Sequence, residues 1–179
     1  MLRIALLFNL YLISFGCIAH DINIATFQIR HLENQRWIYE VMTPLSNLDR
    51  SLRVKNQNAP DADINSIQYK QSIVKYIKQG FAVTAIGYNA DAKDSTSEIA
   101  LQLGQGRIKL NDHLSVLMFE IKGMPEIVSQ LDFHFSSMSE FRPANNIFRM
   151  IDGDKKQRCF LNQGNNYSGS ISRFFKQSR

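Results

Sequence analysis

The chain has little cysteine: only Cys17 and Cys159 occur among its 179 residues. Cys17 falls in an N-terminal segment that we expect to be removed, so Cys159 remains as a single thiol and no internal disulfide can form. Cys159 lies in an apolar strand pattern with Phe160 and Leu161, which favours a buried, inert thiol over a reactive one. Without disulfides, the domain must depend on its hydrophobic core for stability.

The motifs of the common enzyme classes are also missing. The sequence contains no Gly-rich phosphate loop, no Gly-x-Ser-x-Gly motif, no His-Glu-x-x-His motif and no paired-cysteine zinc spacing. Cys159 could form a nucleophile pair with His113 or His134, but nothing in the local sequence supports it. The sequence therefore favours a non-enzymatic protein, with a hydrolase that has an unrecognised site as an alternative.

The sequence has no apolar run long enough to span a membrane. Its longest mostly apolar segment lies near the N-terminus and is short. Arg3 precedes a mostly apolar segment at residues 4–15, and Cys17-Ile18-Ala19 then places small residues where a signal peptidase needs them. A membrane span needs roughly 20 apolar residues, more than this segment has. We therefore expect residues 1–19 to be a signal peptide and residues 20–179 to form one exported domain, periplasmic or extracellular, without a transmembrane segment. An uncleaved anchor and a lipoprotein processed at Cys17 are the alternatives.

The charge balance is mildly basic. The chain has a formal net charge of +5, and removal of Arg3 with the signal peptide would leave +4, spread along the chain. This excess suits an anionic surface such as a membrane or wall polymer, but it forms no nucleic-acid-binding stripe. In the basic tail, residues 170–179, Phe174 and Phe175 could touch a membrane surface weakly, or the tail could pack back on the domain or fray.

Short apolar runs with alternating polar residues predict a mainly β protein. The first pair, residues 21–32 and 37–42, is separated by a polar turn and predicts an antiparallel hairpin. Gly104-Gln105-Gly106, Gly123-Met124-Pro125 and Asp152-Gly153-Asp154 are predicted turns between later strands. The later strands are expected at residues 81–88, 98–103, 107–110, 115–121, 131–135, 147–151 and 156–161. This number and spacing predict a two-sheet antiparallel β-sandwich.

Two helices are expected in one insertion after the first hairpin, near residues 46–53 and 64–79. Ser46 and Asp63 are the predicted N-caps, and Gly80 is the predicted stop of the second helix. Tyr69, Ile73, Tyr76 and Ile77 recur at helical spacing, which favours a helix lying on the core over a partner-binding helix.

One possible metal site begins at His20. Cleavage after Ala19 would give His20 a free α-amine beside its imidazole, and this nitrogen pair suits copper(II). A second imidazole would have to come from His31, His113 or His134, and His134 is the metal ligand that we predict with His20 because it falls on the polar face of its strand with Asp132. Solvated surface histidines are the alternative.

Asparagines gather at two places late in the chain, Asn145-Asn146 and Asn162, Asn165 and Asn166. Asparagine is favoured in turns because its side chain bonds to nearby backbone, so structural turns are the first expectation. A rim that recognises a glycan or a peptide is the alternative.

Several short features occur in an order seen in a known group of proteins: His20, residues 26–29, residues 37–43, Leu48-Asp49, residues 69–77 and Asn145-Asn146-Ile147. In these features the chain resembles small exported bacterial proteins of unknown function whose mature part begins with histidine. It is more distantly similar to the extracytoplasmic domain of HupE/UreJ-like hydrogenase and urease accessory proteins, although it has none of their membrane helices. The resemblance implies an extracytoplasmic β-sandwich and a metal context, nickel in particular, but no activity.

We therefore expect an exported, non-enzymatic domain that binds a protein partner in the periplasm or cell envelope. The alternative is a periplasmic protein that binds copper or nickel through His20.

The position of the cleavage site can be tested directly. The intact mass of the exported protein should correspond to a chain that starts at His20. If it does, calorimetry with copper and nickel should show heat that a His20→Ala variant loses. Any other N-terminus would remove the amine-and-imidazole pair and with it the metal hypothesis.

Overall fold

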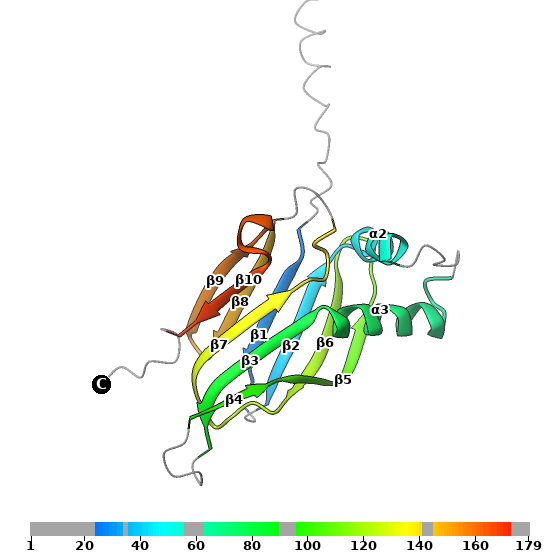
Figure 1. Ribbon diagram of the computed structural model, residues 1–179. Helices are drawn as coiled ribbons and strands as arrows, with labels where there is room; N and C mark the ends of the chain where they lie inside the picture. The colour runs from blue at the N-terminus through cyan, green and yellow to red at the C-terminus, as the bar shows by residue number, and fades with distance from the viewer. Residues whose placement is uncertain (1–23, 34–35, 56–62, 90–95, 141–144, 173–179) are drawn as a thin grey trace, which may run out of the picture.

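The computed structural model describes residues 24–33, 36–55, 63–89, 96–140 and 145–172, which form two packed β-sheets with two helices beside them (Figure 1). The six-stranded sheet has the strand order β5-β6-β2-β1-β8-β9, and the four-stranded sheet has the order β10-β7-β3-β4. The strands are β1 (Thr26–His31), β2 (Trp37–Thr43), β3 (Phe81–Tyr88), β4 (Ser97–Ala100), β5 (Gln102–Lys109), β6 (Ser115–Lys122), β7 (Ile127–Phe135), β8 (Asn146–Asp152), β9 (Lys155–Leu161) and β10 (Ser168–Ile171).

The pairing is antiparallel throughout the four-stranded sheet and in all but one pair of the six-stranded sheet. The exception is β1, which pairs with β2 on one side and runs parallel to β8 on the other. The structure therefore confirms the predicted mainly β, two-sheet, mostly antiparallel sandwich with a helical insertion after the first hairpin.

Both predicted helices are present, as α2 (Leu45–Lys55) and α3 (Ile67–Gln79). Their first residues differ from the prediction. Ser66, not Asp63, caps α3, because its hydroxyl accepts a hydrogen bond from the Tyr69 amide at 3.1 Å. Asp63 instead accepts from the Asn65 amide in the preceding turn, at 2.9 Å. α2 begins directly after Pro44, so Ser46 lies inside the helix.

The apolar stripe of α3 faces the core, as predicted. Tyr69, Ile73, Tyr76 and Ile77 are buried and belong to one cluster with the inward side chains of both sheets. α3 leads straight into β3 and also contacts β5, so the helices cover part of the six-stranded sheet beside the four-stranded one (Figure 1). No helix in the described part of the chain has both the length and the apolar character to cross a bilayer.

The core is built around aromatic rings between the two sheets. Phe135 of β7 is fully buried, and its ring centroid lies 5.2 Å from that of Phe27, 5.4 Å from Tyr39 and 5.2 Å from Phe148. These partners come from β1, β2 and β8, so one side chain joins the four-stranded sheet to three strands of the other. Removing a buried phenylalanine typically destabilises a protein by about 3–5 kcal/mol.

The prediction of one strand at residues 98–103 followed by a turn at Gly104-Gln105-Gly106 is wrong. β4 ends at Ala100 in the four-stranded sheet, and β5 begins at Gln102 in the six-stranded sheet. The chain changes sheets at buried Leu101, whose amide donates to the Val83 carbonyl at 2.8 Å. The Gly-Gln-Gly segment lies within β5, where it forms a bulge.

β10 was not predicted, since Ser168–Ile171 has only one apolar side chain with which to show a pattern. Its Gly169 is required by packing, because a Cβ at this position would come within 2.7 Å of the Phe133 ring. The predicted membrane contact through Phe174 and Phe175 lies outside the described residues.

Asn146 at the start of β8 joins two distant segments. Its fully buried side chain accepts a hydrogen bond from the Ala25 amide at 3.1 Å and donates one to the Met138 carbonyl at 3.2 Å. Asn146→Ala would leave both backbone groups without these partners, so we expect the free energy of unfolding in urea to fall by about 2–4 kcal/mol. The exposed neighbour Asn145 provides the control. Asn145→Ala should change the free energy of unfolding by less than about 0.5 kcal/mol. Equal effects of the two substitutions would contradict this role.

Candidate functional site

The predicted metal ligand His134 lies on the outward face of β7, half-buried and on the same face as Asp132, as expected. Its Nδ1 lies 3.0 Å from the Asn166 carbonyl oxygen and 2.9 Å from the Ser168 hydroxyl, so β10 already uses this nitrogen. Asp132 accepts two hydrogen bonds from the Gln130 amide, at 2.8 and 3.0 Å. Both side chains are therefore already engaged in hydrogen bonds on the outer face of the four-stranded sheet.

The other ligand, His20, lies outside the described residues. Within them, no group of three or more His, Cys, Asp or Glu side chains is placed to hold a metal ion. His31 lies at the end of β1, His113 in the exposed connection between β5 and β6, and His134 on β7, so no two of them share an element. Metal binding through His20 stays a prediction.

The asparagine clusters have structural roles. Asn162 and Asn165 form a capping box around a short 3-10 turn at Gln163–Asn165. Asn146 is buried, as described above. The amides of these three residues are used within the domain, which fits structural turns better than a recognition rim.

The outer face of the six-stranded sheet carries a continuous row of paired side chains. Because the alternate residues Phe27, Tyr39, Phe119 and Phe148 point into the core, their neighbours point outward. The strand registers align one outward residue from each strand. In order across the sheet these residues are Arg107, Met118, Glu40, Gln28, Arg149 and Arg158.

Two further rows flank the first one. One consists of Lys109, Val116, Met42, Thr26, Ile147 and Phe160, and the other of Glu120, Ile38, Arg30, Ile151 and Lys156. We call the outward side chains of the three rows the basic face. It holds six basic residues and two acidic ones, with apolar side chains between them.

Most positive charges of the basic face are not neutralised. The Glu40 carboxylate accepts a hydrogen bond from the Gln28 amide at 3.1 Å and lies 3.9 Å from the Arg30 guanidinium. Arg107, Lys109 and Arg149 are exposed, and within the described residues they make no ion pair. These charges remain available for a partner.

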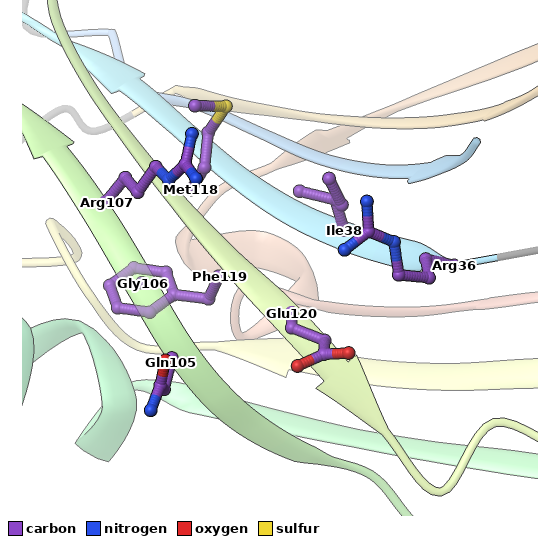
Figure 2. Close-up of a pocket in the computed structure, with 8 residues that line it drawn as sticks. All are labelled: Arg36, Ile38, Gln105, Gly106, Arg107, Met118, Phe119 and Glu120. Carbon is purple, nitrogen blue, oxygen red and sulfur yellow. The ribbon is translucent and has the colours of Figure 1, made fainter. Parts of the chain in front are cut away.

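A hollow of about 420 Å³ lies on the basic face at the bulge of β5 (Figure 2). At the bulge Leu103 pairs with Ile121 and Gly106 with Phe119, so two residues of β5 stand opposite Glu120 alone. Arg107 and Arg36 extend into the hollow from opposite sides, over Met118 and Ile38 (Figure 2). Two guanidinium groups above an apolar floor can hold a carboxylate that is attached to an apolar segment.

A second cavity, which we call the end cleft, opens between the sheets at one end of the sandwich and has a volume of about 670 Å³. One wall is the last rung of the six-stranded sheet, in which Trp37, His31, Asp152 and Lys155 are direct neighbours on β2, β1, β8 and β9. The opposite wall is formed by residues 123–128. The end cleft and the hollow share Arg36 and Glu120, so they adjoin each other.

The wall at residues 123–128 is held against β3. A Cβ on Gly87 would lie 2.2 Å from the Ile127 carbonyl oxygen, so glycine allows this close approach. The Glu126 amide donates to the Asn89 side chain at 3.2 Å, and Gly123 adopts a φ of +85° in the turn. The predicted Gly123-Met124-Pro125 connection between two strands is thus confirmed.

The basic face and the end cleft escaped sequence analysis, because their residues come from up to six strands that are far apart in the chain. The sequence shows that basic residues are spread along the chain. It does not show the strand registers that bring them together on one face of the sheet. Comparison with known proteins adds nothing to the assignment: no protein-family model matches the chain, and no curated protein matches it. The resemblance to exported bacterial proteins and to HupE/UreJ-like proteins stays a prediction.

Cys159 lies on the inward face of β9, where it is half-buried and packs against the core. Burial raises the pKa of its thiol above the ordinary value, because the thiolate is poorly solvated there. Since the thiolate is the nucleophile, the folded protein should react with a disulfide reagent more slowly at pH 7 than the urea-unfolded chain does.

The pH dependence should show the same effect. The half-maximal rate should occur at a higher pH in the folded protein than in the unfolded chain. Equal rates in both states would show that Cys159 is not shielded.

Proposed function

We propose that this protein is an exported, non-enzymatic binding domain whose basic face docks on an acidic, partly apolar surface of a protein in the periplasm or cell envelope. The observation that carries the proposal is the outer face of the six-stranded sheet, which no described helix or strand covers. Within the described residues, exposed Arg107, Lys109 and Arg149 on this face make no ion pair. The signal-peptide pattern at residues 1–19 supports the location.

The composition of the basic face favours a protein partner over a bare polyanion. Met118, Ile38 and Ile151 are half-buried, and Phe160 is 58% exposed, all between charged residues. A nucleic acid or acidic polymer would neutralise the charges but would leave these apolar side chains uncovered. A protein surface offers apolar area and carboxylates together, which is the usual composition of an interface.

The charges would act mainly on the rate and specificity of association. Opposite potentials on two surfaces steer their encounter, and salt weakens this attraction. The apolar side chains would then stabilise the docked complex. The hollow between Arg36 and Arg107 is suited to a carboxylate of the partner, since two guanidinium groups can hold it.

Charge reversal can test the proposal with matched lysines. A partner can be captured by cross-linking in the envelope fraction, and its affinity then measured with purified proteins. Lys109→Glu with Lys156→Glu, on the two edge strands of the basic face, should weaken binding roughly tenfold or more. Lys70→Glu with Lys75→Glu, both exposed on α3, should leave it within about twofold. Equal losses in the two double variants would contradict docking on the basic face.

The apolar contribution needs its own variant. Phe160→Ala should weaken the protein complex, whereas binding to heparin or to anionic vesicles should be nearly unchanged by it. If only the polyanion or the vesicles bind, and Phe160→Ala has no effect on any ligand, the partner is not a protein.

A further inference from the structure

We propose that the end cleft binds an uncharged, polyhydroxylated ligand, a sugar ring or the end of a glycan. This site is separate from the basic face in its chemistry and goes beyond the proposed protein docking. The proposal rests on the last rung of the six-stranded sheet, on the mixture of acidic and basic side chains in the cleft and on its apolar floor.

The rung holds an aromatic platform in place. The rings of Trp37 and His31 stack with centroids 4.4 Å apart and planes 13° apart. His31 Nδ1 lies 2.8 Å from an Asp152 carboxylate oxygen. The carboxylate accepts a hydrogen bond from the imidazole and so fixes the orientation of the ring. Lys155 stands opposite Asp152 in the backbone register of β8 and β9. Trp37 is half-buried, so part of its indole faces the cleft, and its position is set before any ligand arrives.

Side chains of both charges line the end cleft, in contrast to the mostly positive basic face. The carboxylates of Glu120, Glu126 and Asp152 line it together with the cationic groups of Arg36 and Lys155 and the imidazole of His31. Such a cleft has no strong preference for an ion of either sign. It offers carboxylate acceptors and guanidinium and ammonium donors side by side, which suits hydroxyl groups because each hydroxyl both donates and accepts.

The floor of the end cleft is apolar. Ile121 of β6 is buried, and in the opposite wall Pro125 and Val128 are buried and Met124 is half-buried. A sugar ring has C–H groups on its faces and hydroxyls at its edge, so it can contact the indole and the floor while its hydroxyls reach the charged rim. The volume of about 670 Å³ lies in the usual range for small-molecule sites.

Trp37 is the only tryptophan, so its fluorescence reports on the cleft without any label. The full mature protein should be titrated with glucose, galactose, maltose, N-acetylglucosamine and its β-1,4-linked trimer, to about 20 mM, which detects Kd values in the millimolar range. We expect a saturable change in intensity or emission maximum with at least one of these sugars. Dipeptides with free termini and short alcohols serve as zwitterionic and apolar probes.

Adjacent lysines on opposite faces of β9 provide the matched variants. Lys155 lines the end cleft, whereas Lys156 belongs to the basic face. Lys155→Ala should weaken sugar binding at least fivefold, and Lys156→Ala should leave it within twofold, with binding of a protein partner affected in the opposite way. Asp152→Asn should also weaken sugar binding, provided that its thermal unfolding shows a folded domain.

Three results would overturn the proposal. The first is the absence of a saturable change with every sugar. The second is a response to dipeptides or alcohols that exceeds the response to sugars. The third is an equal loss of sugar binding in Lys155→Ala and Lys156→Ala. None of them bears on docking through the basic face, so the two proposals can fail independently.

Discussion

The stacking of aromatic rings around Phe135 is the contact on which the rest of the structure depends. Phe135 belongs to the four-stranded sheet, and it packs on Phe27, Tyr39 and Phe148 in three adjacent interior strands of the other sheet. With no disulfide among the described residues, this dry layer has to hold the two sheets together. It also fixes which side of each strand is inward, because a shift of one residue would expose every ring.

The same constraint creates both proposed sites. When Phe27, Tyr39 and Phe148 turn inward, their neighbours Gln28, Glu40 and Arg149 must turn outward, and no helix or strand of the described chain covers them. Where the aromatic layer ends, the inward positions of the same strands carry Trp37, His31 and Asp152 in place of core residues. The two proposed sites are thus one face and one end of the same sheet, and the connection at residues 123–128 completes the second of them.

The elements that could be predicted were those whose apolar residues recur at strand or helix spacing. Leu131, Phe133 and Phe135 alternate with polar residues, and Tyr69, Ile73, Tyr76 and Ile77 recur at helical spacing, so the strand and the helix were both found. The change of sheet at Leu101, the glycine-containing β10 and the parallel pairing of β1 with β8 depend on distant contacts and leave no local pattern. The candidate sites were missed for the same reason, since Arg107 and Arg158 lie on opposite edges of one sheet.

The parallel pairing of β1 with β8 has a consequence for when the protein can fold. β1 contributes residues from Thr26 onward, but its neighbour Ile147 and the Asn146 amide that fastens Ala25 are made only near the end of synthesis. The interior pairing of the six-stranded sheet therefore cannot form until most of the chain has been made. Contacts between residues so far apart in sequence also form slowly. If the protein is exported through a narrow channel, as we propose, this delay would keep the chain unfolded during transport, and the core would form only afterwards.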